Sequence, residues 1–277
     1  MRLTNTPRAG VSRLEAIVVV HLVVLTGLLL IPACDQKIRT LAARTQSTNN
    51  LKNIALSMHA FHDANKRLPF NGTKAAIGGD YKSGSWAFQI LLFIDQQPLF
   101  NAPAPTTDVP AYMCPGRSRP STQAGLGAWT DFFINNYIND PANASKPDNP
   151  DRLVMLKDIT DGMSNTVVAG QGNISTRDYQ AVGGVVGSHN IFAGGSAGTM
   201  RAGPDWVKGQ PLLVTLAPDT TNPPNLKAGG WGGPYPQGGL IAMGDATVRM
   251  FAYSLSPQTF GELLTPTGGE KVQLPDS

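Results

Sequence analysis

Charge is scarce in this sequence. Only 15% of its 277 residues are charged, and the formal net charge at pH 7 is +3. So small and dispersed an excess of positive charge is not typical of a protein that binds nucleic acid. Cysteine is scarcer still, because Cys34 and Cys114 are the only two. They allow at most one internal disulfide and do not form a metal-ligand cluster.

Glycine and proline are abundant, with 30 and 22 residues, so turns and short strands should make up much of the chain. Residues 35–67 are the exception, since they contain neither glycine nor proline. Apolar residues recur there at roughly helical spacing: Ile38, Leu41, Ala42, Leu51, Ile54, Leu56, Met58 and Phe61. This pattern predicts a helix that ends before Pro69.

A long apolar run precedes that segment. From Ala16 to Ala33 the only ionisable side chain is His21. As a helix, the run is long enough to cross most of a ~30 Å hydrocarbon core. Together with residues 35–67 it predicts one helix of about fifty residues, apolar first and amphipathic later. A cleaved export signal and a lipoprotein modified at Cys34 are alternative interpretations of the same run.

The expected orientation rests on length rather than on charge. Basic residues flank the apolar run on both sides, so their count does not decide the matter. A long downstream region tends to be translocated regardless of its charge. We therefore expect a single-pass protein of the cytoplasmic membrane, with the N-terminus in the cytoplasm and the C-terminal domain periplasmic or external.

The residues RAGVSRLEAIVVVHLVVLTGLLLIPA resemble the class III leader and first helix of type IV pilins and pseudopilins. A short basic leader ends in Gly10, a glutamate (Glu15) is the fifth residue after it, and Pro32 stands where the family has a proline that kinks the helix. The resemblance implies that a prepilin peptidase cuts after Gly10 and leaves Val11 as the N-terminus. It also implies that Glu15 meets the free amine of a neighbouring pilin-like subunit, which offsets the cost of a carboxylate at the membrane edge. Arg13 departs from the pattern, which normally has an apolar residue there.

Further blocks along the chain resemble those of the DUF1559 family, which is abundant in planctomycetes and described as pilin-like at its N-terminus. The blocks are, in this order, AARTQSTNNLKNIALSMHAFHDANKRLP, SWAFQILLFIDQQPLF, YMCPGRSRP, ITDGMSNTVVAGQ and GGLIAMGDATVRMFAYSLSP. They span nearly the whole chain. Because no catalytic role is established for that family, the resemblance implies an envelope location and an architecture rather than a reaction.

The C-terminal motif of that family is a histidine, nine residues and Asp-Gly. Here Tyr235 stands in place of the histidine, Asp245 keeps the aspartate, and Ala246 replaces the glycine. Ser47 is a further departure, because many members carry a cysteine there. A phenol, with a reference pKa of about 10, does not replace imidazole as a base at neutral pH without a large shift. We therefore expect Tyr235 and Asp245 to be structural.

These observations predict an α+β fold of pilin-like design. Its long N-terminal helix, membrane-spanning in its first half, should pack on an antiparallel sheet with long loops rich in Gly and Pro. Apolar, β-branched and aromatic runs broken by turn residues predict the strands: 131–138, 165–170, 179–187 and a hairpin within 238–254. Gly244 and Asp245 should form the turn of that hairpin.

The remaining segments complete this organisation. Ser256 as N-cap and Pro257 at the first helical position predict a helix after the hairpin. Segments 101–128 and 203–237 hold much of the Pro and Gly and are predicted to be surface loops. The expected division is a leader at 1–10, a membrane-spanning part at 11–34 and an extracytoplasmic domain at 35–277.

Two patterns resemble catalytic or zinc sites. His59 and His62 share a helix face, as two zinc ligands could, but the sequence nominates no further ligands, and a polar helix face packed on a loop is the alternative. Ser196 in GGSAG matches a nucleophile elbow. A hydrolase of that fold has its histidine last, yet the final histidine, His189, precedes Ser196. A glycine-rich loop is the favoured interpretation.

One further pattern suggests a calcium-binding site. Asp158, Asp161 and Asn165 lie close together in DITDGMSN, and their side-chain oxygens suit that ion. Major pseudopilins use calcium in a loop, which supports the idea by analogy. However, the spacing fails the EF-hand template, and Asp-Gly is a common turn signal. No other cofactor is predicted.

The sequence thus predicts a protein that is not an enzyme. The first hypothesis is a membrane-anchored pseudopilin-like structural or assembly protein of the bacterial envelope, of the kind that secretion and pilus systems use. The alternative is a monomeric anchored module that binds polysaccharide or protein. Arg13 separates the two, because a charge at the start of the helix suits the membrane edge better than a filament core. A third interpretation, a hydrolase, is disfavoured because the sequence offers no complete set of catalytic residues for it.

Overall fold

The computed structural model divides the chain into two compact units, Met1–Ala43 and Arg44–Ser277, and each is described by itself. The side chains of residues 23–35 lie outside the description. The residues that the structure describes are 12–72, 74–123, 127–139, 154–180, 190–194, 197–201, 211–222, 230–269 and 272.

Helix α1 runs over 53 residues, Arg13–Asn65. A single helix of this length that ends before Pro69 was predicted, and both points are confirmed. Its first turn is closed reciprocally, because the Ser12 hydroxyl accepts a hydrogen bond from the Glu15 amide (3.2 Å) and the Glu15 carboxylate accepts one from the Ser12 amide (2.9 Å). This arrangement is a capping box, which satisfies two amides that a helix start otherwise leaves unpaired.

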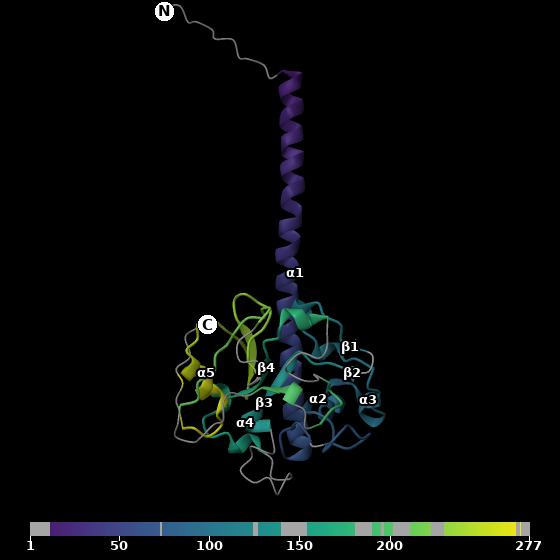
Figure 1. Ribbon diagram of the computed structural model, residues 1–277, viewed down its shortest axis with the longest axis vertical. Coiled ribbons are helices and arrows are strands. Elements are labelled where there is room, and N and C mark those ends of the chain that lie inside the picture. Colours follow the sequence, from purple (N-terminus) through teal and green to yellow (C-terminus); the bar gives the residue numbers. More distant parts are fainter. Residues whose placement is uncertain are drawn as a thin grey trace, which may run out of the picture. The chain divides into compact units, whose positions relative to one another are not determined.

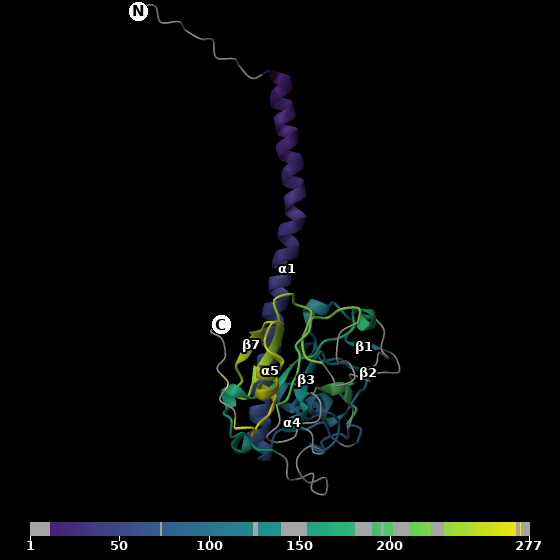
Figure 2. The same cartoon turned by 60° about the vertical axis from the view of Figure 1, so that its left-hand side comes forward.

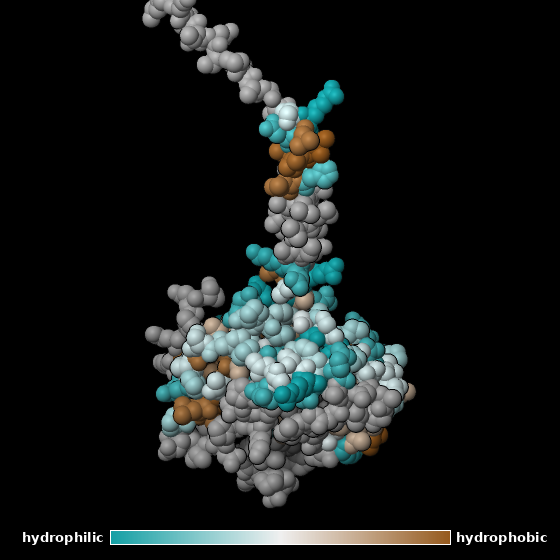
Figure 3. All heavy atoms as spheres, turned by 45° about the horizontal axis from the view of Figure 1, so that its top comes forward, coloured by the Kyte–Doolittle hydropathy of each residue, from teal (hydrophilic) through white to brown (hydrophobic). Residues whose placement is uncertain are grey.

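The first unit carries exposed apolar side chains near the start of α1 (Figure 3). They are Leu14, Ile17, Val18, Val19, Val20 and Leu22. Across the part of the chain that the structure describes, we find no helix that combines the length and the apolarity needed to span a bilayer.

The second unit, whose strands β3 and β4 are labelled in Figure 1, is built on a five-stranded sheet. The order of its strands is β5-β3-β4-β6-β7. The strands are β3 (Phe132–Asn135), β4 (Val167–Gln171), β5 (Met200–Arg201), β6 (Gly239–Met243) and β7 (Val248–Phe251). β3, β4, β6 and β7 pair antiparallel, as predicted. The prediction of a purely antiparallel sheet is wrong at one edge, where the two-residue β5 joins β3 in parallel. So short a strand has no sequence period that could set its direction.

The predicted strands are confirmed in part. Segment 165–170 contains β4, and 238–254 forms the β6–β7 hairpin. Segment 131–138 contains β3 but then turns into the short helix α4 (Asn136–Asn139), because the Asn135 side chain accepts a hydrogen bond from the Tyr137 amide and ends the strand. Most of the strand predicted at 179–187 lies outside the described residues.

The two faces of the sheet bury different partners, since successive strand residues point to opposite sides. On one face, Phe132, Ile134, Ala169, Leu240 and Ala242 share a hydrophobic cluster with a stripe on α1: Leu51, Ile54, Ala55, Met58 and Phe61. On the other face, Val167, Ile241, Met243 and Phe251 pack with Phe260, Leu263 and Leu264 of α5 (Pro257–Leu264), which lies beside β7 (Figure 2). α5 begins as predicted, with the Ser256 hydroxyl accepting from the Thr259 amide at 3.0 Å.

Short helices connect these elements. In the described ranges, α2 (Trp86–Gln89) and α3 (Gln97–Asn101) are α-helical, like the short α4. Seven are 3-10 helices: η1 (Leu91–Ile94), η2 (Pro110–Tyr112), η3 (Pro115–Arg117), η4 (Leu156–Asp158), η5 (Met163–Asn165), η6 (Thr176–Tyr179) and η7 (Ala197–Thr199). A separate two-stranded ribbon pairs β1 (Thr122–Gln123) with β2 (Gly127–Ala128).

The prediction that 101–128 and 203–237 are surface loops is wrong for the parts that the structure describes near their centres. Both segments bring residues into the interior: Val109, Tyr112, Cys114 and Arg117 from the first, and Leu216, Trp231 and Tyr235 from the second. Proline and glycine mark the absence of long regular elements, but they do not determine depth. A loop can be buried where side chains satisfy its backbone groups.

The turn of the β6–β7 hairpin contains a left-handed residue. Ala246 has φ of 63°, and its amide donates to the Met243 carbonyl at 2.9 Å. The Asp245 carboxylate accepts from the Thr247 amide (2.9 Å) and hydroxyl (2.6 Å), so Asp245 stabilises the turn that it was predicted to form. Alanine is unfavourable at this φ because its Cβ approaches the following carbonyl oxygen.

Replacing Ala246 by glycine should therefore stabilise the domain. We expect Ala246→Gly to raise the free energy of unfolding by about 0.5 kcal/mol, since relief of the left-handed strain outweighs the lost methyl group. The measurement is guanidinium unfolding followed by the fluorescence of the buried Trp86, Trp129 and Trp231. The control is Ala252→Gly, at an exposed position without positive φ, which should destabilise. Equal destabilisation by both variants would contradict the assignment.

Candidate functional site: a buried polar cluster around Cys114 and Asp131

Three side chains from distant parts of the chain meet inside the second unit. Ser47 of α1 and Tyr235 share a hydrogen bond of 2.8 Å, and the Cys114 sulfur lies 3.3 Å from the Ser47 oxygen and 3.5 Å from the Tyr235 oxygen. All three are buried. The structure thus brings together Ser47 and Tyr235, two of the positions at which the sequence departs from the family pattern.

A fourth side chain completes this group. Gln171, at the end of β4, donates a hydrogen bond from its side-chain nitrogen to the Cys114 sulfur (3.1 Å), while its side-chain oxygen accepts from the Leu240 amide (3.1 Å). The glutamine therefore joins the thiol to β6, and both of its polar atoms are used. A buried side-chain amide is costly when its polar atoms have no partner, and here its nitrogen and its oxygen each have one.

The environment keeps the thiol and the phenol protonated. Burial raises the pKa of Cys114, and it also raises the pKa of Tyr235, to which the neighbouring Cys114 adds. A reactive cysteine needs a lowered pKa, because the thiolate is the nucleophile. Neither Cys114 nor Tyr235 is therefore suited to act as a nucleophile or base at neutral pH.

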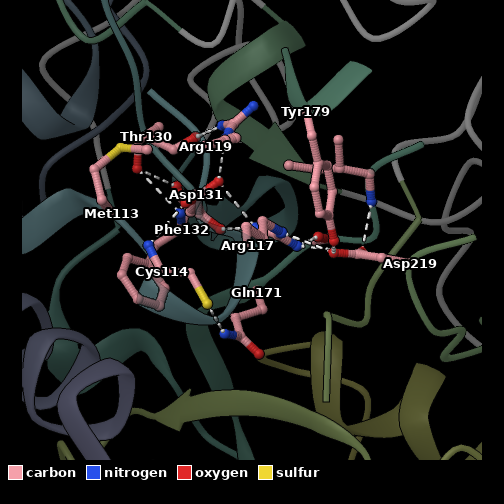
Figure 4. A network of polar contacts seen from close by, with 12 residues as sticks. Met113, Cys114, Arg117, Arg119, Thr130, Asp131, Phe132, Gln171, Tyr179 and Asp219 are labelled. Atoms are coloured by element: carbon pink, nitrogen blue, oxygen red, sulfur yellow. Dashed lines mark hydrogen bonds and ion pairs between the residues drawn. The ribbon is translucent and has the colours of Figure 1, made fainter. Parts of the chain in front are cut away.

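Next to this group lies a network of buried ion pairs (Figure 4). Arg117, in η3, contacts Asp131 from Nη1 at 3.1 Å and Asp219 from Nε at 2.8 Å. Arg119 contacts the same Asp131 oxygen from Nε at 2.7 Å. Arg117 also donates to the carbonyl of Gly172, which follows β4. The network thereby joins η3 to the start of β3 and to the end of β4.

Backbone and hydroxyl donors complete the shells of both carboxylates. Asp131 accepts a hydrogen bond from the Cys114 amide at 2.7 Å, so the ion pairs are directly connected to the cluster of side chains around Cys114. Asp219 accepts from the Ile174 amide (2.8 Å) and from the Tyr179 hydroxyl (2.7 Å). Carboxylates whose oxygens accept this many hydrogen bonds are typical of structural ion pairs. They have few lone pairs left to bind a ligand.

Electrostatics keeps the central arginine charged. Burial lowers the pKa of Arg117, but the Asp219 and Asp131 carboxylates outweigh this effect and raise the pKa well above its ordinary value. Burial lowers the pKa of Arg119, and Asp131 compensates only in part. The ion pairs hold distant segments of the chain together.

The sequence of this chain matches one protein-family model. The model of a family described as "Protein of unknown function (DUF1559)" matches residues 36–258. The chain belongs to this family. No curated protein and no solved structure matches it. The predicted family membership is therefore confirmed, and the structure supplies what the family description lacks, which is the arrangement of its residues.

The two C-terminal motif residues of this DUF1559 protein have separate surroundings. Tyr235 is buried in the cluster of side chains around Cys114, whereas Asp245 is exposed in the β6–β7 turn. His59 of α1 connects α1 to that turn, because its Nε2 lies 2.8 Å from the Gly244 carbonyl oxygen. The interpretation of this helix face as one packed on a loop is thus confirmed for His59. His62 lies 3.6 Å from the Asp63 carboxylate.

The residues proposed for calcium make local contacts. The Asp161 carboxylate accepts from the amides of Gly268 (2.7 Å) and Gly269 (2.9 Å), and Asp158 accepts from the Met155 amide (2.8 Å). Asn165 donates to the Asp161 carbonyl at 3.4 Å. Among the residues that the structure describes, no three His, Cys, Asp or Glu side chains form a group that could hold a metal ion. Gly10, Val11, His189 and Ser196 lie outside those residues.

Sequence reasoning missed the ion-pair network. Arg117 and Arg119 were visible only as part of the block YMCPGRSRP, and Asp131 and Asp219 stand in unrelated segments. No spacing rule connects residues 117, 131 and 219, because loops of irregular length separate them. The one available signal was scarcity, since each charge in a chain with 15% charged residues is a candidate for a specific partner.

The short distance between Ser47 and Cys114 leads to a prediction about Ser47→Cys. The new thiol should form a disulfide with Cys114, because their γ atoms are already 3.3 Å apart and a disulfide needs about 2 Å. We expect mild oxidation to reduce the free thiols from three to one, which leaves that of Cys34, and to add about 2 kcal/mol of stability. Thiol titration and mass spectrometry, with and without reductant, measure the bond.

The matched control for that variant is Ser57→Cys. Ser57 also lies buried on α1, but its hydroxyl donates to the Phe93 carbonyl and not to a sulfur. It should keep its thiol free. Three free thiols in oxidised Ser47→Cys, instead of the one at Cys34, would contradict the geometry of the cluster.

The network should also matter for stability. Asp131→Asn and Asp219→Asn each remove a charge that compensates a buried arginine, so each should lower the free energy of unfolding by about 3 kcal/mol. Asp63→Asn is the control, since the Asp63 side chain is 81% exposed, and its effect should stay within about 0.5 kcal/mol. Urea unfolding measures all three. If the buried variants behave like the exposed one, the network does not stabilise the fold.

Proposed function

We propose that this DUF1559 protein is a membrane-anchored, pilin-like structural or assembly protein of the bacterial envelope, comparable to a pseudopilin, and that it is not an enzyme. The observation that carries the proposal is the apolar surface at the start of α1. Leu14 is 75% exposed, and Ile17, Val18, Val19 and Val20 are each more than half exposed. A soluble helix does not expose such a surface without a partner.

The arrangement of these side chains supports a surrounding apolar phase. Four consecutive residues from Ile17 to Val20 cannot lie on one face of a helix, because each is turned by about 100° from the last. An amphipathic helix packs one face, whereas a helix that is apolar all round lies in a membrane or inside a bundle. We infer that residues 11–34 span the cytoplasmic membrane, with the N-terminus in the cytoplasm and residues 35–277 on the periplasmic or external side.

The pilin-like processing belongs to the same proposal. A prepilin peptidase would cut after Gly10 and leave Val11 as the N-terminus, and other pilin-like subunits would be the partners of the exposed helix. Glu15 is the residue proposed to meet a neighbouring subunit, although within its own chain its carboxylate already caps the Ser12 amide. The two roles are separable, because glutamine keeps the capping geometry and loses the charge.

The described interior supports a structural role over a catalytic one. The buried Cys114 and Tyr235 remain protonated, since burial raises the pKa of both. The charged groups near them are paired with one another, as Arg117 is with Asp131 and Asp219. Such a network stabilises a domain that must remain folded outside the cell, where it supports binding or assembly.

Arg13 favours a second candidate, a monomeric anchored module that binds polysaccharide or protein. Arg13 is exposed in the first turn of α1, where the positive end of the helix dipole makes a cation unfavourable. Anionic headgroups at a membrane edge would compensate this charge, and a filament core would not. The two candidates differ in whether the helix contacts other copies or only lipid.

Processing can be tested on the protein purified from membranes. We expect N-terminal sequencing to begin at Val11. An intact Met1 would contradict cleavage by a prepilin peptidase, and a terminus at Cys34 would support the lipoprotein alternative.

Assembly can be tested with charge and cap variants of one turn. Glu15→Gln should abolish crosslinking between subunits in membranes, because it removes the carboxylate charge while keeping the cap. Ser12→Ala should leave crosslinking largely intact, because it weakens the cap by about 1 kcal/mol and keeps the charge. Crosslinking that survives in Glu15→Gln, or that never occurs in the unmodified protein, would favour the monomeric module.

A further inference from the structure

One buried charge takes no part in the ion-pair network. Arg201, at the end of β5, is 1% exposed, so its guanidinium is removed from solvent. It lies against the Phe133 ring of β3, with 3.5 Å between its central carbon and the ring centroid. Gly172 lies close to both side chains, because any Cβ at residue 172 would collide with Nε of Arg201 and with the Phe133 ring. Burial at this depth is costly for a charge without a partner.

Within the described part of the chain, only one of the three guanidinium nitrogens of Arg201 has a hydrogen-bond acceptor. Nη1 of Arg201 donates to the Met200 carbonyl at 2.8 Å. Nε and Nη2 are buried and have no hydrogen-bond partner among the residues that the structure describes. These two atoms lie on the same edge of the planar guanidinium, and their N–H bonds are parallel. This is the fork that binds the two oxygens of a carboxylate.

The charges around this edge do not balance. In this part of the interior, Arg117, Arg119 and Arg201 contribute three positive charges, while Asp131 and Asp219 contribute two negative charges, which leaves one positive charge over. Both carboxylates already contact the other two arginines. Burial lowers the pKa of Arg201 to about 9, and repulsion from Arg117 and Arg119 contributes. At neutral pH the guanidinium is still charged.

We propose that Arg201 is an anion-binding residue that holds the carboxylate group of a small organic acid through Nε and Nη2. The bound carboxylate supplies the missing negative charge, the Met200 carbonyl fixes the third nitrogen, and Phe133 holds the plane of the fork. This proposal goes beyond the envelope role proposed above and does not depend on it. A domain with this site would combine a structural interior with a ligand that stabilises it.

The test is a titration of the full-length protein in detergent with sodium acetate, at constant ionic strength maintained with sodium chloride. Thermal unfolding is followed by tryptophan fluorescence. We expect the apparent Tm to rise in a saturable way, by about 5 °C at an acetate concentration near 100 times the Kd. Sodium phosphate under the same conditions should raise Tm less, because its tetrahedral oxygens fit the planar fork less well.

Three variants separate the site from general effects. Arg201→Met should lose the acetate response and, in chloride alone, should be at least as stable as the unmodified protein, because it removes an uncompensated buried charge. Arg201→Lys keeps the charge but not the fork, so its Kd for acetate by calorimetry should rise at least tenfold. Arg177→Met, at an exposed position on η6, should respond to acetate like the unmodified protein.

Several results would overturn the proposal. These are a Tm that acetate does not change, an acetate response that survives in Arg201→Met, or one that is also lost in Arg177→Met. A stronger response to phosphate than to acetate would show that the fork does not select carboxylates. If Arg201→Met does not fold, an unchanged acetate affinity in Arg201→Lys would by itself refute the bidentate contact.

Discussion

The fold of the second unit depends on one buried guanidinium. Arg117 connects Asp131, Asp219 and the Gly172 carbonyl, and through them the loop before β3, the loop after β4 and the segment at 219. Removing one partner of a charge pair at this depth leaves the other charge buried and uncompensated, which is strongly destabilising. In a chain with so few charged residues, this dependence concentrates much of the specificity in a few side chains. The surrounding loops can then be long and rich in glycine without losing their positions.

The cluster of side chains around Cys114 links the ion-pair network to α1. Asp131 accepts from the Cys114 amide, and the Cys114 side chain contacts Ser47 of α1, Tyr235 and Gln171. Polar contacts at this point fix the register of α1 against the loops, which the neighbouring apolar stripe of Leu51, Ile54 and Met58 alone would not do, because apolar packing has little directional preference. A serine at position 47 gives this register by hydrogen bonding, where a cysteine facing Cys114 would give it covalently.

The two units illustrate different physical problems. The second unit buries a small network of paired charges around Arg117, whereas the start of α1 exposes apolar side chains that its own unit does not cover. The capping box of Ser12 and Glu15 stabilises the helix start without reference to any partner. Glu15 thus has a role inside its own chain in addition to the one proposed between chains. Any account of assembly has to separate the charge of this residue from its geometry.

Local signals in the sequence were sufficient for several elements. The absence of glycine and proline between residues 35 and 67, Pro69 after the helix, the β-branched runs of β4 and the hairpin, and Ser256 before Pro257 each predicted an element that the structure confirms. These signals work because they act within a few residues through backbone sterics and nearby hydrogen bonds. The α+β class and the family followed from them and from the ordered blocks along the chain.

Only the tertiary structure decided which polar residues meet. Ser47 and Tyr235 were singled out as departures from a family pattern, but their contact with Cys114 joins positions 47, 114 and 235, and no periodicity relates such distant positions. The same holds for Arg117 with Asp131 and Asp219, for the parallel pairing of β5, and for the burial of loops that composition placed at the surface. Local chemistry determines where elements begin and end. The depth and pairing of side chains depend on how loops of irregular length close, which is a property of the whole packed domain.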